Sequence, residues 1–158
     1  MTLSLRACSD NDLEWIVELR AVVLRADLER VGRFDPIRVR QWMRNGFRAA
    51  DTQVIVLDGA DIGSIAVRRE TDARWLEYFY IAPEFQGMGF GSQVLEQVLA
   101  AQESSPLRLN VLRGSRAQRL YERHHFTLDP EVDTDDVHLH MTYRPPGSPA
   151  LTGGDARK

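Results

Sequence analysis

The chain has 158 residues, of which 43% are hydrophobic and 27% are charged, and its formal net charge is −3. This length suits one well-packed domain and is short for two. The weakly acidic balance gives no electrostatic footprint for nucleic acid, and no apolar run approaches the ~20 residues of a membrane span. We therefore expect neither nucleic acid nor a membrane as a partner.

The cysteine content and the first residues indicate the compartment. Cys8 is the only cysteine, so no disulfide can form within the chain, and a reducing compartment is the default. The segment Met1–Arg6 lacks the apolar core and the small-residue cleavage site of a signal peptide. We therefore expect a cytoplasmic protein.

The first half of the chain predicts one strand, two helices and a pair of strands. Asp35 followed by Pro36 marks the start of the second helix, because aspartate caps helices and proline suits the first helical position. We expect this helix to bury Val39, Trp42 and Met43. The expected elements are a strand over 3–7, a helix from 13 to a break at 28–33, a helix over 35–47, and strands over 52–57 and 61–68 joined by a turn at 58–59.

The second half alternates strands with two helices. Residues 146–158 have no large apolar residue except Leu151, so we expect a flexible tail after a domain that spans residues 1–145. The expected elements are a strand over 74–81, a helix over 89–102, a strand over 107–111, a helix over 116–124, and strands over 126–128 and 137–143 around an acidic loop at 129–136.

The predicted order is β-α-α-β-β-β-α-β-α-β-β. This order indicates an α+β fold with a mixed, mostly antiparallel sheet of about seven strands flanked by about four helices.

The most informative motif is the glycine-rich stretch Gln86–Gly91, between the strand over 74–81 and the helix that follows. Such a loop turns backbone N–H groups toward a ligand, and the helix dipole adds partial positive charge, so it predicts a phosphate or pyrophosphate. A P-loop needs a lysine after the glycines, but Ser92-Gln93 follows here. A dinucleotide-binding fold needs another glycine spacing and an acidic residue about 20 positions on, and the chain has neither.

These residues resemble the coenzyme A loop of the GNAT superfamily of N-acetyltransferases, written Gln/Arg-x-x-Gly-x-Gly/Ala. Gln86, Gly89 and Gly91 occupy its three fixed positions. A second block, Leu109–Phe126, looks like the family's strand–turn–helix that ends in Ala-x-x-Leu-Tyr-Glu-x-x-Gly-Phe. The predicted order of elements over residues 3–144 is also that of the GNAT fold.

The second block departs from the family pattern at two positions. The family often has asparagine just before this helix, where it contacts the cofactor, and Ser115 stands there in this chain. The glycine usual before the final phenylalanine is His125. Histidine is costlier than glycine if the backbone must adopt a positive φ.

The resemblance implies an N-acetyltransferase that moves an acetyl group from acetyl-coenzyme A to a primary amine by direct attack in a ternary complex. Backbone N–H groups of the glycine loop would hold the pyrophosphate. The strand before the loop would pair with the peptide-like pantetheine arm, so we expect a bulge near Phe79-Tyr80 and parting from Leu109–Val111. The implied cofactor-binding residues are Phe79, Tyr80, Ile81, Gln86, Gly87, Met88, Gly89, Phe90, Gly91, Ser92 and Ser115.

Two side chains are candidates for the proton transfers. An alkyl ammonium with a pKa of about 10 cannot attack a thioester at neutral pH, so a base is needed. Glu77 matches the family's glutamate, and its two-residue spacing from Phe79 and Ile81 predicts that all three share one face of the sheet. The alternative is that Glu77 pairs with an arginine such as Arg68 or Arg74.

Tyr121 stands at the family's tyrosine position, where it would protonate the departing thiolate. The alternative is a core tyrosine packed beside Leu120. A backbone N–H near Ile81 would stabilise the developing oxyanion.

Other functions stay open. The histidines at 124, 125, 138 and 140 lack a completing cysteine or carboxylate spacing, so we expect no metal site. A GNAT-like domain that binds an acyl-coenzyme A or a metabolite without turnover, as a sensor, is the alternative to an enzyme. The acceptor is open among protein N-termini, lysine side chains, polyamines, aminoglycosides and small amino compounds. A homodimer is a further expectation, because dimers are common among proteins of this appearance.

Overall fold

The computed structural model describes residues 1–101, 103–130, 132 and 135–147, and the expected tail lies outside the described residues from residue 148 onward. The predicted order of strands and helices is confirmed. The strands are β1 (Leu3–Ala7), β2 (Thr52–Leu57), β3 (Ala60–Arg69), β4 (Arg74–Ile81), β5 (Leu107–Leu112), β6 (Thr127–Leu128) and β7 (His138–Tyr143). The helices are α1 (Leu13–Arg30), α2 (Pro36–Gly46), α3 (Phe90–Leu99) and α4 (Arg116–Arg123), with short 3-10 turns η1 (Asp10–Asp12), η2 (Ala49–Asp51) and η3 (Pro83–Phe85).

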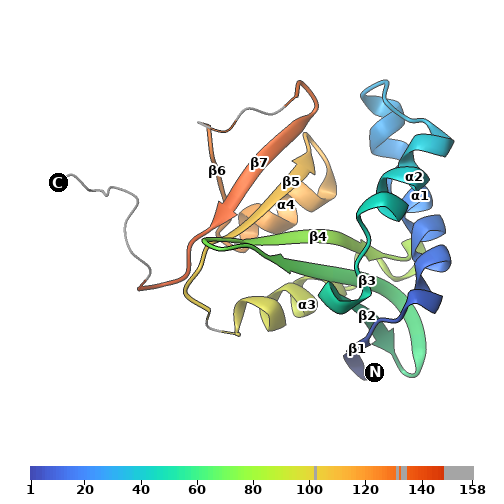
Figure 1. Cartoon of the computed structure of the whole chain (residues 1–158), viewed down its shortest axis with the longest axis horizontal. Helices are drawn as coiled ribbons and strands as arrows, with labels where there is room; N and C mark the ends of the chain where they lie inside the picture. The colour runs from blue at the N-terminus through green and yellow to red at the C-terminus, as the bar shows by residue number, and fades with distance from the viewer. Residues whose placement is uncertain (102, 131, 133–134, 148–158) are drawn as a thin grey trace.

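The strands form one seven-stranded sheet in the order β1-β2-β3-β4-β5-β7-β6. All neighbouring pairs are antiparallel except β4 and β5, which are parallel and are connected through α3. Figure 1 shows α1 and α2 side by side at one end of the sheet, with α4 behind β5. Within the described residues, no helix is both long enough and apolar enough to cross a membrane.

Two clusters of buried side chains hold the helices against the sheet. The larger cluster joins the apolar faces of α3 and α4 to the central strands, for example through Leu95 and Tyr121. The smaller cluster joins α1 and α2 to the sheet, with Ile16 from α1, Met43 from α2 and Tyr80 from β4. The central strand β4 therefore contributes side chains to both cores.

The start of α2 is as the sequence predicts. The Asp35 side chain accepts hydrogen bonds from the backbone N–H groups of Ile37 and Arg38, and Pro36 occupies the first helical position. Val39 and Met43 are buried, but the prediction for Trp42 is wrong, because 66% of this side chain is exposed. Val39 and Met43 lie four residues apart and form the contact stripe, so the neighbouring position points away from it.

Two helix ends differ from the predictions. Helix α1 continues through Arg30, beyond the break expected from residue 28, because leucine, glutamate and arginine are all good helix formers. Gly32 follows the C-cap residue Val31, and its φ of 74° suits the position just after a helix end. Helix α3 ends at Leu99 instead of near residue 102, which itself lies outside the described residues.

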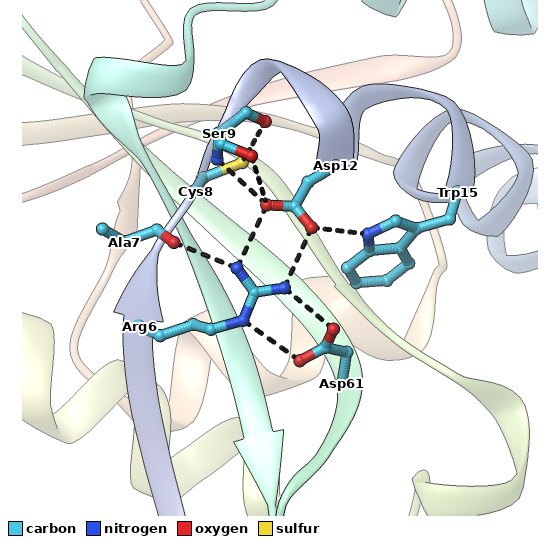
Figure 2. A network of polar contacts seen from close by, with 7 residues as sticks. All are labelled: Arg6, Ala7, Cys8, Ser9, Asp12, Trp15 and Asp61. Carbon is cyan, nitrogen blue, oxygen red and sulfur yellow. Dashed lines mark hydrogen bonds and ion pairs between the residues drawn. The ribbon is translucent and has the colours of Figure 1, made fainter.

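An ion-pair network fixes the start of α1 to the sheet (Figure 2). The guanidinium of Arg6 on β1 donates to both oxygens of Asp12, at 3.1 and 2.9 Å, and to both oxygens of Asp61 on β3, at 3.2 and 2.8 Å. Asp12, only 7% exposed, also accepts from the Trp15 indole N–H and from the Ser9 backbone N–H. These donors hold the pKa of the Asp12 carboxyl well below its usual range.

Candidate active site

The two central parallel strands separate along most of their length. β4 pairs with β5 only through Arg74 with Leu107 and Trp75 with Arg108. β4 continues to Ile81 in contact with β3, and β5 continues to Leu112 in contact with β7. The predicted parting near residues 109–111 is therefore confirmed. It leaves backbone groups on the facing edges of β4 and β5 without strand partners, as an extended, peptide-like ligand requires.

A β-bulge interrupts β4 beside this opening. Ser64 pairs with Tyr80 and Ala66 with Glu77, so Tyr78 and Phe79 together lie opposite the single residue Ile65. Tyr78 has a φ of 50°, and its carbonyl accepts a 2.7 Å hydrogen bond from the Ser64 hydroxyl. The bulge was expected near Phe79-Tyr80 and lies one residue earlier.

The bulge changes which side chains share a face. Phe79 and Ile81 pack into the core under α3 and α4, whereas Tyr78 and Tyr80 pack on the side of α1 and α2. Leu76 packs in the same core as Phe79 and Ile81, so Glu77, the next residue of the strand, faces the other side of the sheet, together with Tyr80. The prediction that Glu77, Phe79 and Ile81 share one face is therefore wrong. An extra residue in the bulge breaks the two-residue alternation on which that prediction rested.

The surroundings of Glu77 also differ from the apolar setting that the sequence suggested. Both of its carboxylate oxygens accept from the Arg68 guanidinium at 3.1 Å, and 28% of the Glu77 side chain is exposed. Arg68 also donates to Glu70 at 2.5 Å and lies over the ring of Trp75. The ion-pairing alternative is thus the arrangement seen in the structure. It holds the carboxylate in one orientation, facing the α1–α2 side of the sheet.

Tyr121 lies on the other side of β4, on the buried face of α4. It is 7% exposed, and its ring packs against Phe126 and Phe79 with centroid distances of 5.4 and 6.5 Å. Burial raises the pKa of the Tyr121 phenol, and the neighbouring Tyr80 raises it further. The phenol therefore keeps its proton at neutral pH and is able to donate it.

The Tyr121 hydroxyl makes no hydrogen bond to the residues that the structure describes, although the residue is only 7% exposed.

The glycine loop connects the end of β4 to α3. Gly87 and Gly89 have φ values of 76° and 87°, a left-handed conformation that side chains disfavour. Gly89 is the N-cap of α3, and its carbonyl accepts from the backbone N–H of Gln93. The N–H groups of residues 90–92, between Gly89 and Gln93, therefore have no partner within the helix and face outward at the positive end of the helix dipole. These N–H groups are placed to bind an anion.

Two of the expected cofactor residues have structural duties in this loop region. The Gln86 side-chain amide donates to the Ile81 carbonyl at 2.8 Å, which fixes the loop to the end of β4. Ser115 is the N-cap of α4, where its hydroxyl accepts from the Gln118 backbone N–H, and it is only 4% exposed. Met88, in contrast, is exposed at the tip of the loop.

One residue at this site was missed from the sequence. Arg116, the first residue of α4, is exposed, and its Nη2 lies 3.4 Å from the position that a Cβ on Gly87 would take. The family pattern directed attention to Ser115, the residue before it. The arginine that follows the Ser115 cap could have indicated this contact, because an arginine side chain is long enough to reach residues outside its own helix.

The histidines are not brought together. His138 contacts Asp135, His140 contacts Asn110, and His124 contacts the Leu120 carbonyl. Over residues 1–101, 103–130, 132 and 135–147, no group of three or more His, Cys, Asp or Glu side chains is arranged to hold a metal ion.

Comparison with known proteins places the chain in a family. Residues 50–128, half of the chain, match the family model described as the acetyltransferase (GNAT) domain. The chain belongs to the GNAT acetyltransferase family. The matched segment contains the bulge, the glycine loop and Tyr121, and it runs from the turn before β2 to the end of β6. No curated protein matches the chain in sequence.

Solved structures share the GNAT fold with this chain at low identity. The PaiA N-acetyltransferase of Thermoplasma acidophilum, solved with coenzyme A, is 20% identical with a TM-score of 0.70, over 91% of this chain and 99% of its own. A structure described as histone acetyltransferase HPA2 and related acetyltransferase, from Corynebacterium glutamicum, is 17% identical with a TM-score of 0.69, over 96% and 100% of the two chains.

A larger protein contains the same fold as a part. The N-acetylglutamate synthase of Neisseria gonorrhoeae, solved with coenzyme A and L-arginine, is 16% identical with a TM-score of 0.65, over 91% of this chain and 33% of its own.

Proposed function

We propose that this protein is an N-acetyltransferase that moves an acetyl group from acetyl-coenzyme A to a primary amine by direct attack in a ternary complex. The observation that carries the proposal is the opening between β4 and β5, which has the glycine loop at the end of β4 and the ring of Tyr121 packed against Phe79 of the same strand. A sheet gap with free backbone groups, an anion site and a proton donor are the three features that a thioester of a phosphorylated, peptide-like carrier needs.

The binding roles follow from this geometry. Backbone N–H groups of the segment 87–92 hold the pyrophosphate at the start of α3. Those backbone groups of residues 79–81 that face β5 and have no partner pair with the pantetheine arm in the gap. The acceptor then approaches from the α1–α2 side of β4, where Glu77 and Tyr80 lie.

The reaction forms a C–N bond and breaks a C–S bond. The neutral amine attacks the thioester carbonyl, and a backbone N–H near Ile81 stabilises the oxyanion that forms. The tetrahedral intermediate collapses and releases the thiolate, which takes a proton from the Tyr121 phenol. Glu77, directly or through water, accepts the proton that the ammonium loses before the attack. The nitrogen loses a second proton as the amide forms, and this proton returns the Tyr121 phenolate to the phenol. The single cysteine supports a reducing compartment, so the proposed location of the enzyme is the cytoplasm.

The proposal is tested by release of free coenzyme A thiol from acetyl-coenzyme A in the presence of a panel of amines. In Tyr121→Phe the ring keeps its packing against Phe126, and only the hydroxyl is lost. We expect kcat to fall roughly 10²- to 10⁴-fold while the KM for acetyl-coenzyme A stays within a few-fold of the parent. The matched control is Tyr143→Phe, because Tyr143 packs on the same Phe126 but belongs to β7. It should leave both constants unchanged.

The sensor alternative predicts tight binding of acetyl-coenzyme A without release of thiol for any amine. Failure of the parent protein to bind acetyl-coenzyme A would overturn both readings.

A further inference from the structure

The first turn of α4 brings a guanidinium to the glycine loop. The Nη2 of Arg116 approaches to 3.4 Å of the position that a Cβ on Gly87 would occupy. Gly87 has a φ of 76° and lies two residues before Gly89, the N-cap of α3. The guanidinium of Arg116 therefore lies directly beside the glycine loop.

Arg116 has no ion-pair partner among the residues that the structure describes, whereas many other arginines do. Arg40 pairs with Glu18 and Arg44 with Glu14, for example. Arg116 belongs to a stripe with Arg119 and Arg123, which are also exposed and also without an ion pair in the described residues. The spacing i, i+3, i+7 places all three on one face of α4. An unneutralised cationic stripe on a chain with a net charge of −3 attracts anions locally.

Ser115 is occupied elsewhere. Its hydroxyl caps α4 and its side chain is buried, so it is not placed to contact a ligand in the loop. The next residue along the chain is the one that reaches Gly87. Of these two residues at the start of α4, the one whose side chain reaches the glycine loop is therefore Arg116.

We propose that Arg116 is a phosphate-binding residue of the cofactor site, which holds the pyrophosphate of coenzyme A against the backbone N–H groups of the loop. This inference rests on the proposed function. A guanidinium donates two parallel hydrogen bonds to a phosphate and stays charged at any physiological pH, so it adds both geometry and charge to the amides of the loop. The anion is then held between the N-termini of α3 and α4.

The test measures binding of coenzyme A and of 3′-dephospho-coenzyme A by calorimetry to the parent, Arg116→Ala, Arg116→Lys and Arg123→Ala. Both ligands contain the pyrophosphate, and only the first contains the 3′-phosphate. Arg123 is a matched control, because it lies on the same face of the same helix, about 10 Å further from the loop at 1.5 Å per residue. Thermal melts of each variant report folding, which the exposed and unpaired Arg116 should not affect.

We expect Arg116→Ala to weaken both ligands by a similar factor, roughly 10- to 100-fold, as the loss of a charge-assisted hydrogen bond predicts. Arg116→Lys should lose less affinity, because lysine keeps the positive charge but lacks the two parallel N–H donors of the guanidinium. Arg123→Ala should bind within two-fold of the parent.

Three results would overturn the assignment. The first is unchanged binding in Arg116→Ala. The second is a loss confined to coenzyme A, because it would locate the contact at the 3′-phosphate. The third is an equal loss of affinity in Arg123→Ala, because it would show that the effect comes from the net positive charge of α4 and not from a contact made by Arg116. If the parent itself binds neither ligand, the proposed function fails together with this inference, whereas a binding parent with an unaffected Arg116→Ala rejects the inference alone.

Discussion

Glu77 and Arg68 form a two-pronged ion pair on the α1–α2 face of the sheet, with both N–O distances at 3.1 Å. A carboxylate held this way is oriented, but it shares its lone pairs with the arginine. The two roles considered for Glu77, base and structural partner, therefore predict different results for the two members of the pair.

We expect Glu77→Gln to lower kcat about 10²-fold, because a proton acceptor is lost while the side chain keeps its shape. Arg68→Gln leaves the carboxylate in place and should keep kcat within a few-fold. Steady-state kinetics at saturating acetyl-coenzyme A, with a melting temperature for each variant, distinguish a catalytic role of Glu77 from a structural one. Equal losses of activity and of stability in both variants would reduce Glu77 to a structural partner.

His125 has a φ of 72°, in the left-handed region that β-carbons disfavour. We expect His125→Gly to stabilise the protein by about 1 kcal/mol, because relief of this strain exceeds the entropy that glycine adds to the unfolded chain. Urea unfolding at constant m-value measures the change. His124→Gly is the control, because His124 has a φ of −103° and makes a bond to the Leu120 carbonyl. It should not stabilise the protein, and an equal gain in both variants would contradict the strain argument.

Gly63 lies where β3 runs against the last residues of β4. A Cβ there would overlap the backbone carbonyl of Tyr80 and lie 3.2 Å from the Cα of Ile81. We expect Gly63→Ala to cost about 2 kcal/mol or more, since backbone atoms must move, and to weaken coenzyme A binding, since Tyr80 and Ile81 line the gap. Unfolding and calorimetry test both effects.

Gly59→Ala is the control for that experiment, because it introduces backbone strain without a steric overlap. Gly59, unlike Gly63, has a positive φ, of 85°, and nothing lies within 4 Å of its Cβ position. This variant should lose stability without losing ligand affinity. A loss of affinity equal to that of Gly63→Ala would contradict the local explanation.

Asp12 should make the protein sensitive to acid. Its pKa is lower in the folded protein than the ~3.9 of an unfolded chain, mainly because Arg6 donates to it. The unfolded state therefore binds a proton first, so this carboxylate contributes stability above about pH 4 and loses it as pH falls toward the folded pKa.

We expect Asp12→Asn to be less stable than the parent by about 3 kcal/mol at pH 7, and this penalty to shrink by roughly 1 kcal/mol at pH 3, because the folded carboxylate stays ionised there while the unfolded one is mostly protonated. Urea unfolding at both values measures the difference. Asp61→Asn removes the other carboxylate from the same arginine at a more exposed position, so it should cost less stability at pH 7 than Asp12→Asn. A penalty for Asp12→Asn that is independent of pH would contradict the linkage.

The order of elements was predictable because each boundary carries a local chemical signal. Asp35 and Pro36 start α2, Asp58-Gly59 turns β2 into β3 with both residues at positive φ, and Ser115 caps α4. These signals act over three or four residues, so they are visible in the sequence without knowledge of the fold.

What the sequence could not give was the direction of side chains after an irregularity. The bulge at Tyr78-Phe79 inserts one residue, and the alternation that assigned Glu77 to the face of Phe79 fails there. A bulge depends on the pairing of two strands, and neither strand alone records it. The partner of Glu77 and the approach of Arg116 to Gly87 are likewise contacts between distant segments.

The exposure of Trp42 has the same origin. Any amphipathic pattern assigns a tryptophan between two buried positions to the core, but α2 is covered by α1 and the sheet on only one stripe. Which stripe is covered depends on the angle at which the helices pack.

The two residue pairs between β4 and β5 make the sheet, in mechanical terms, a four-stranded half and a three-stranded half joined at one corner. A pantetheine arm lying in the gap as proposed would act as the missing strand and make the hydrogen-bonded ladder continuous across the molecule. The ligand would then belong to the fold as well as to the reaction, and its binding would stabilise the protein by mass action. The resistance of this enzyme to heat and to proteolysis would thus follow the concentration of its own acetyl donor.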